Sequence, residues 1–110
     1  MKKSNLNVNL EDLDPKMIEF IAKLEKVLDR ELVATSGYRS PEHPIEAKKE
    51  KPGEHAEGLA VDVIAVGGPS VYEIVSKAIK LGCKRIGISR KSNFIHLGLS
   101  PDRVNSIWTY

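Results

Sequence analysis

The chain of 110 residues has little cysteine, histidine or aromatic content, and it lacks any long hydrophobic run. A single cysteine, Cys83, excludes an internal disulfide and any multi-cysteine zinc finger. No apolar stretch approaches the roughly 18–20 residues that a membrane-spanning helix needs. The net charge of +2 is too small to indicate nucleic-acid binding. We therefore expect neither a membrane nor a nucleic acid as a partner.

The composition itself is that of an ordinary globular protein, with 41% hydrophobic and 29% charged residues. Its length is that of one domain, since domains most often have roughly 100–150 residues. Residues 1–13 are polar and are interpreted as an N-terminal arm, followed by one domain over 14–110. Cys83 follows the helix-stopping Gly82, and we expect it to be a buried thiol.

Hydrophobic spacing predicts two helices and four strands. The first helix starts at Asp14-Pro15, and the second starts at a capping box formed by Ser70 and Glu73. Because the last two strands read as a hairpin, we predict an α+β fold with a small antiparallel sheet and helices packed on one face. The tail is expected to pack back on the body. The predicted helices are 15–30 and 70–81, the strands 32–36, 59–66, 85–89 and 94–99, and the tail 107–110.

Residues 37–58 form a long segment with many charges and little apolar periodicity. Loops longer than about 12–15 residues within a compact domain are usually functional or disordered. Within this segment, the charged run 46–51 is interpreted as a solvated flap.

Three polar side chains lie next to or within the apolar strands. Asp62 is a lone acid in its strand, His96 is in the last strand, and His55 ends the long loop. Burial of an unpaired polar group is costly, so each needs a partner. Singly, each histidine could be structural, and Asp62 could pair with an arginine or cap a loop. One zinc ion would satisfy all three, because imidazole and carboxylate are standard zinc ligands.

Three motifs occur in order along the chain. Ser36-Gly37-Tyr38-Arg39-Ser40-Pro41-Glu42-His43 comes first, the pattern H-x-x-G-x-A-x-D follows at 55–62, and Phe94-Ile95-His96 comes last. In these motifs the chain resembles the zinc D-alanyl-D-alanine carboxypeptidase family over roughly residues 14–110. That family includes phage endolysins and bacterial cell-wall carboxypeptidases, and it shares its metal site and core with the hedgehog signalling domain.

The resemblance implies that His55, Asp62 and His96 are the zinc ligands. It also implies that Arg39 is a catalytic and substrate-binding residue, which holds a substrate carboxylate or carbonyl oxygen. A guanidinium fork suits a carboxylate. The alternative for Arg39 is a surface ion pair. Ser36 and Tyr38 are expected to shape the pocket wall.

Two other residues of these motifs have expected structural roles. Gly58 should let the chain turn sharply into the strand that follows. His43 belongs to the first motif as well, and we expect it to structure the loop rather than to bind the metal.

The chain departs from the family pattern at the general base. Relatives place a glutamate or a histidine where this sequence has Asn93 or Phe94, and neither of these can accept a proton from an attacking water. Relatives with the F-[IV]-H pattern often carry aspartate at the position of Gly98. Glu54 and Glu57 lie next to a ligand and could substitute as the base, or they could be solvated loop acids.

The family therefore implies a zinc-dependent peptidase acting on peptidoglycan stem peptides, either as a D-Ala-D-Ala carboxypeptidase or as an endolysin-type peptidase. The missing base motivates an alternative, a non-catalytic hedgehog-like zinc-binding module. A structural domain that has lost its metal is a third possibility. No hydrophobic signal follows the basic N-terminus, so we expect a cytoplasmic protein or a phage-encoded one released by lysis.

Overall fold

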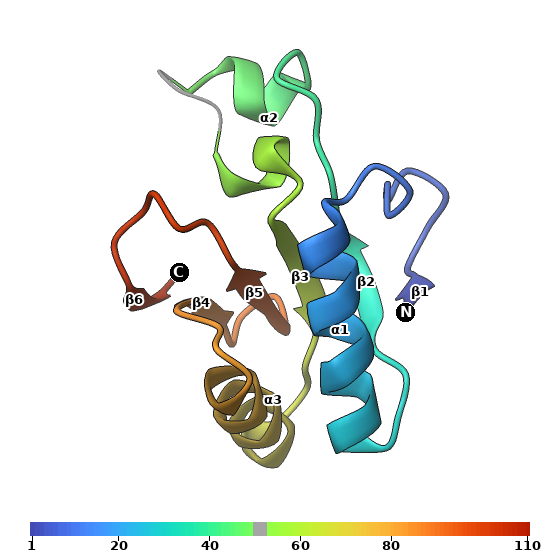
Figure 1. The fold of residues 1–110 in the computed structure, drawn as a ribbon, viewed down its shortest axis with the longest axis vertical. Coiled ribbons are helices and arrows are strands. Elements are labelled where there is room, and N and C mark those ends of the chain that lie inside the picture. The colour runs from blue at the N-terminus through green and yellow to red at the C-terminus, as the bar shows by residue number, and fades with distance from the viewer. Residues whose placement is uncertain (50–52) are drawn as a thin grey trace.

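The structure is a computed structural model that describes residues 1–49 and 53–110. Within the described residues, six strands form one mixed sheet, accompanied by three α-helices and a short 3₁₀ helix, η1 (Figure 1). The strands are β1 (Lys2–Lys3), β2 (Val33–Ser36), β3 (Ala60–Ile64), β4 (Arg85–Ser89), β5 (Phe94–Gly98) and β6 (Ser106–Thr109). The helices are α1 (Pro15–Leu28), α2 (Pro44–Ala47), η1 (Glu54–Glu57) and α3 (Gly68–Lys80).

The strand order is β1-β2-β3-β5-β4-β6, and the sheet is antiparallel only in its centre. Strands β2, β3, β5 and β4 pair antiparallel, whereas β1 pairs parallel to β2 and β6 pairs parallel to β4. The predicted antiparallel sheet is therefore wrong at both edges. The physical reason is that the edge strands come from the two chain ends, and the hairpin pattern in the sequence describes only the centre.

The two long helices, α1 and α3, cover one face of the sheet. Alternate side chains of a strand point to opposite faces, so Val61 and Val63 join the core while Asp62 points away from it. In β5 the same alternation separates Ile95 and Leu97 from His96. The polar residues of the central strands thus emerge on the face that the long helices leave open.

The helix starts show which capping signals were correct. The Asp14 carboxylate accepts a hydrogen bond from the backbone N–H of Lys16 at 2.8 Å, as expected for a cap. Helix α3 begins at Gly68, so the capping box predicted at Ser70 and Glu73 is wrong. Those two side chains instead accept hydrogen bonds from Arg30, which ties α3 to the end of α1.

Both ends of the chain pack on the sheet. β1 extends the sheet beside β2, and Val8 and Leu13 of the N-terminal segment are buried. At the other end, the predicted packing of the tail is confirmed, because β6 runs beside β4 and places Trp108 opposite Gly87.

The long loop contains structure that its charge pattern concealed. His43 caps α2 by accepting a hydrogen bond from the N–H of Ile45 at 3.1 Å, so its expected role in structuring the loop is confirmed. Glu46 is only 1% exposed, and the prediction of a solvated flap is wrong there. The rest of that prediction falls partly on Glu50 and Lys51, which lie outside the described residues.

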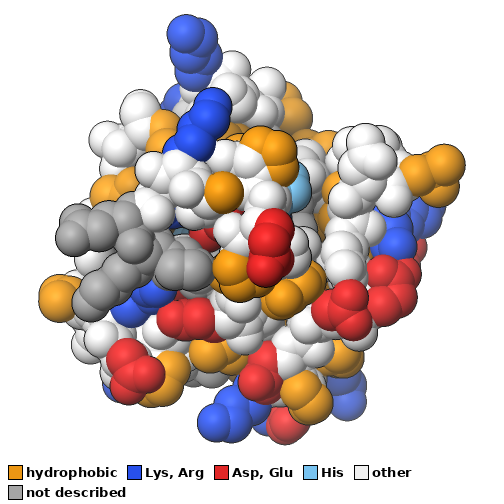
Figure 2. All heavy atoms as spheres, turned by 90° about the horizontal axis from the view of Figure 1, so that it is seen from above, with side chains coloured by type: hydrophobic (Ala, Val, Ile, Leu, Met, Phe, Trp, Pro, Cys, Tyr) orange, Lys and Arg blue, Asp and Glu red, His pale blue; other side chains and the backbone are white. Residues whose placement is uncertain are grey.

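Two surface properties complete the picture of the fold. On the face that carries α2, acidic and basic side chains are interspersed with hydrophobic ones rather than gathered by sign (Figure 2). Among the described residues, none of the helices combines the length and the hydrophobicity that crossing a bilayer requires.

Candidate metal centre

Three buried side chains, His55, Asp62 and His96, converge on the open face of the sheet. Each offers one ligand atom, and these atoms all lie within 4.8 Å of one another. Asp62 and His96 are directly opposite each other in the β3–β5 pair. Neighbouring side chains on one sheet face approach closely in such pairs, so backbone register alone brings these two together.

His55 reaches the same point from η1. Its Nδ1–H donates to the Gly37 carbonyl at 2.8 Å, and its Nε2 lies 3.4 Å from the Asp62 Oδ1. Because a carbonyl can only accept, this contact assigns the ring proton to Nδ1 and leaves Nε2 facing Asp62. Gly58 then turns the chain into β3 with φ of +74°, as its predicted role requires.

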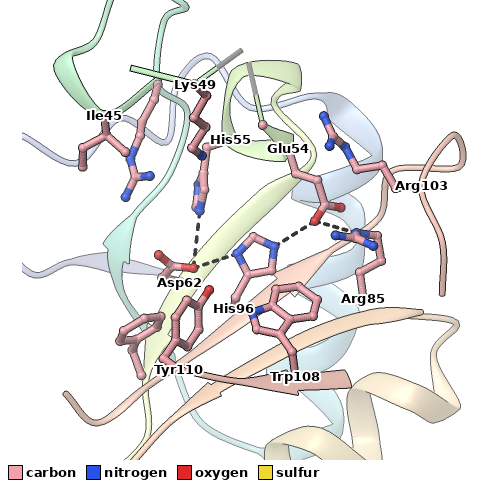
Figure 3. A pocket seen from close by; sticks show the side chains of 13 residues that line it. Ile45, Lys49, Glu54, His55, Asp62, Arg85, His96, Arg103, Trp108 and Tyr110 are labelled. Atoms are coloured by element: carbon pink, nitrogen blue, oxygen red, sulfur yellow. Dashed lines mark hydrogen bonds and ion pairs between the residues drawn. The ribbon is translucent and has the colours of Figure 1, made fainter. Parts of the chain in front are cut away.

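His96 lies between two carboxylates. Its Nδ1 lies 3.1 Å from Asp62 Oδ1, and its Nε2 lies 2.9 Å from Glu54 Oε1. Figure 3 shows the resulting chain of contacts from His55 through Asp62 and His96 to Glu54 and Arg85. Both ring nitrogens face carboxylate acceptors, an arrangement that favours the doubly protonated imidazole in the absence of a metal.

The charges of these groups shift their ionisation. Burial alone would raise the pKa of Asp62, but hydrogen bonds and charges from His55 and His96 outweigh it and hold that pKa well below its usual range. Burial alone would lower the pKa of His96, yet hydrogen bonds to Asp62 and Glu54 outweigh it and raise that pKa. The cluster therefore pairs an ionised carboxylate with a readily protonated imidazole.

This donor set fits a zinc ion. Two imidazole nitrogens and one carboxylate oxygen converge on one point, and three protein ligands with an open position are typical of catalytic zinc sites. Asp62 Oδ1 now faces a nitrogen from each histidine, and a cation can replace the Nδ1 proton of His96. His55 and His96 are each held from behind by a second acceptor, as ligating histidines usually are.

The two glutamates considered as substitute bases are engaged elsewhere. Glu54 contacts the Nε2 edge of His96, whereas the other ligand atoms lie on the Nδ1 edge. Glu57 forms an ion pair with Arg103 at 3.1 Å. Among the described residues, Asp62 and Glu54 are the acids that line the cavity, and Asn93 is not one of its lining residues. No other described carboxylate lines the cavity to serve as a base.

A cavity of about 510 Å³ opens over the cluster. Arg39 lines it, and its guanidinium donates to Ser36 Oγ at 2.7 Å and to Glu46 Oε2 at 3.5 Å. Ser36 and Tyr38 line an adjoining hollow that shares Arg39 and Ile45 with the cavity, and Ser36 acts on the cavity by holding Arg39. The cavity is lined by Arg39, Ile45, Lys49, Gly53, Glu54, His55, Asp62, Arg85, Phe94, His96, Arg103, Trp108 and Tyr110.

The sequence analysis assigned no role in the site to several of these residues. Trp108 lies 5.2 Å from His96 between ring centroids, and Arg85 lies 5.1 Å above the Trp108 ring. Tyr110 contacts Phe94, with ring centroids 5.0 Å apart. Burial, which outweighs an opposing hydrogen bond from Trp108, raises the pKa of Tyr110 and keeps it a phenol. The C-terminal strand thus supplies an aromatic wall.

The fold and the donor set define a class of protein, an α+β domain with a buried His/Asp/His centre in an open cavity. The comparison with protein families identifies which one. The model of the Peptidase M15 family matches residues 2–98, a range that includes all three residues of the centre. The chain belongs to this family of zinc metallopeptidases, as its three motifs predicted. No curated protein and no solved structure matches it.

Proposed function

We propose that the protein is a zinc-dependent peptidase that cleaves peptidoglycan stem peptides, as a D-Ala-D-Ala carboxypeptidase or an endolysin-type peptidase. The observation that carries this proposal is the convergence of His55, Asp62 and His96 at the base of a cavity that Arg39 also lines. Membership of a metallopeptidase family supports the same reading.

In this proposal, His55, Asp62 and His96 hold the zinc ion. Bound zinc would act as a Lewis acid on the scissile carbonyl and would lower the pKa of a water ligand towards about 7. Without it, the chain's own contribution is positional: Asp62 keeps its negative charge, and His55 is held in one tautomer by Gly37.

Arg39 is the proposed contact for the substrate carboxylate or the developing oxyanion. Its guanidinium is only partly buried, with 18% of its side chain exposed, and Ser36 and Glu46 hold it in place. A planar cation fixed at a cavity wall can bind a carboxylate in a defined orientation. Tyr110 also lines the cavity, and as a phenol it would donate a hydrogen bond to substrate rather than accept a proton.

The second candidate is a non-catalytic zinc-binding module. The observation in its favour is that, among the described residues, the two acids lining the cavity are occupied, Asp62 by two histidines and Glu54 by His96 and Arg85. A dedicated base typically contributes about 10²–10⁴-fold to rate. A site without one keeps the metal but turns over slowly or not at all.

The decisive experiment loads purified protein with zinc and measures D-alanine release from a peptide ending in D-Ala-D-Ala, and solubilisation of purified cell wall. We expect cleavage in one of these assays and none with His96→Ala. Stoichiometric zinc without cleavage above the H96A background would support the binding module instead. Protein that retains no zinc would contradict both candidates.

A further inference from the structure

Glu54 is a buried carboxylate that the proposed reaction does not use. It is 5% exposed and accepts hydrogen bonds from three donors, one on β4, one on β5 and one in the loop after β5. Its Oε1 accepts from His96 Nε2 at 2.9 Å and from Arg85 Nε at 2.8 Å. Its Oε2 accepts from the Ser100 backbone N–H at 3.2 Å. A carboxylate with this many fixed partners has a defined position.

That position lies directly behind a metal-facing ring. His96 presents its Nδ1 edge to Asp62 and its Nε2 edge to Glu54 (Figure 3). Because an ionised carboxylate only accepts hydrogen bonds, Glu54 favours a proton on Nε2. In a neutral His96 ring, Nδ1 is then the nitrogen whose lone pair can bind a metal.

We infer that Glu54 is a positioning residue, which holds His96 in the tautomer and orientation that present Nδ1 to the metal. The inference rests on the proposed zinc site, and it replaces the idea that Glu54 substitutes for the missing base. Arg85 contributes to this positioning, because it donates a hydrogen bond to Oε1, the same Glu54 oxygen that accepts from His96. Arg85 is itself held by the Val104 carbonyl and by the Trp108 ring.

Gly98 is the position that makes this arrangement possible. It lies two residues after His96 on the same face of β5, and its cross-strand partner in β4 is Arg85. A Cβ atom at Gly98 would lie 2.3 Å from Glu54 Oε2 and 2.5 Å from Oε1. The carboxylate of Glu54 therefore fills the space that any side chain at residue 98 would occupy.

The first test measures zinc affinity by chelator competition, on folded protein, for wild type, Glu54→Gln and Glu57→Gln. The E54Q amide cannot accept from all three donors, and loss of a carboxylate behind a ligating histidine typically costs about 10–100-fold in metal affinity. We expect a loss of that size for E54Q. The E57Q control removes the same charge from the same 3₁₀ helix and should leave zinc affinity within about threefold.

Cobalt substitution separates positioning from a general effect on folding. If Glu54 orients His96, the visible absorption bands of the Co²⁺-loaded protein should shift in E54Q but not in E57Q, because they report ligand geometry. E54Q that binds zinc within threefold of wild type, with an unchanged cobalt spectrum, would overturn the inference. Wild-type protein that binds no zinc would instead contradict the proposed function.

A second pair of variants keeps the test informative if E54Q folds poorly. Gly98→Ala should displace the Glu54 carboxylate and weaken zinc binding by a similar factor. In the Glu54→Ala variant, Gly98→Ala meets no carboxylate, so adding it should reduce zinc affinity little further. Fully additive losses across this double-mutant cycle would contradict a role for Gly98 in accommodating Glu54.

Discussion

The candidate metal centre has two halves that are built differently, a sheet side and a loop side. On the sheet side, Asp62 and His96 are paired residues of β3 and β5. Their separation is set by backbone hydrogen bonds of the central sheet, above a core of buried hydrophobic residues. Backbone pairing alone brings these two residues side by side, and side-chain contacts then orient the His96 ring.

On the loop side, residues 37–58 supply His55 and Arg39, and polar contacts position them. The Gly37 carbonyl accepts from His55, and the backbone N–H of Arg39 donates to the His55 carbonyl at 3.1 Å. Two buried glutamates then anchor the loop: Glu46 holds Arg39, Lys49 and the Gly53 N–H, and Glu54 ties the loop to the sheet.

The difference teaches that the two halves should fail in different ways. Changes to Asp62 or His96 should remove the metal site itself, because these two ligands are part of the sheet. On the loop side, changes to residues other than the ligand His55 should alter stability, ligand orientation or substrate contact while the sheet persists. The two loop glutamates should also be separable, since only Glu54 contacts a proposed ligand.

The largest expected effect is on the sheet side. Asp62→Ala removes the carboxylate that both histidines face, so zinc affinity should fall by more than the roughly 10–100-fold typical of residues behind the ligands. Metal content after gel filtration of zinc-loaded protein measures this. Asp102→Ala, at an exposed turn, is the control and should retain zinc. An equal zinc content in both variants would refute the assignment of Asp62.

On the loop side, Glu46→Gln should reduce the free energy of unfolding by about 2 kcal/mol, because it weakens charge-assisted hydrogen bonds to a buried group. Zinc affinity should stay within threefold of wild type, in contrast to E54Q. Glu42→Gln, an exposed acid of the same loop, is the matched control. Urea unfolding of the metal-free proteins gives the comparison. A tenfold loss of zinc affinity in E46Q would show that the two glutamates do not act separately.

The same variant has a pH signature. Burial alone would raise the pKa of Glu46, but the Gly53 N–H, Lys49 and Arg39 outweigh it and lower that pKa. The stabilisation that ionised Glu46 gives the folded protein is therefore complete above its pKa in the unfolded chain, about 4.3. It is lost as the pH falls through the lower pKa that Glu46 has in the folded protein. The stability difference between wild type and E46Q should shrink on acidification below about pH 4. A difference that stays constant there would contradict this.

The smallest expected effect tests the packing between sheet and aromatic wall. A Cβ at Gly87 would lie 2.6 Å from two atoms of the Trp108 ring. Gly87→Ala should therefore push Trp108 outward, reduce stability by about 1 kcal/mol and shift the emission of this single tryptophan. Gly68→Ala, where a Cβ would meet nothing within 4 Å, should leave the emission unchanged and should not reduce stability. Unchanged emission in G87A would show that Trp108 packs less tightly against Gly87 than the structure indicates.

Local patterns predicted most of the elements. The spacing of Met17, Ile21, Leu24 and Leu28 indicated the first helix, and alternation in 59–66 showed Asp62 as a lone acid in a strand. Those signals come from residues that are close in sequence, so they can be recognised without knowledge of the fold. The capping box at Ser70 failed because Gly67 and Gly68 already start the helix, which frees the Ser70 side chain to bind Arg30.

Long-range contacts account for what was missed. Nothing in Lys2–Lys3 or Ser106–Thr109 indicates a parallel neighbour, because the partner strands lie far away in sequence. A buried glutamate also looks like a solvated one in a charged loop. The signal that could have pointed to Glu54 was Gly98, a position without a side chain on the face of His96.

By itself, the sequence determined the family and the candidate residues, because three ordered motifs specify side-chain chemistry without coordinates. It also showed that His43 was unlike the other two histidines. Only the tertiary structure decided what each acid does. Asp62, Glu46 and Glu54 are all carboxylates, and their roles depend on which donors the fold places within hydrogen-bond reach: two histidines, a loop arginine, or the far edge of His96.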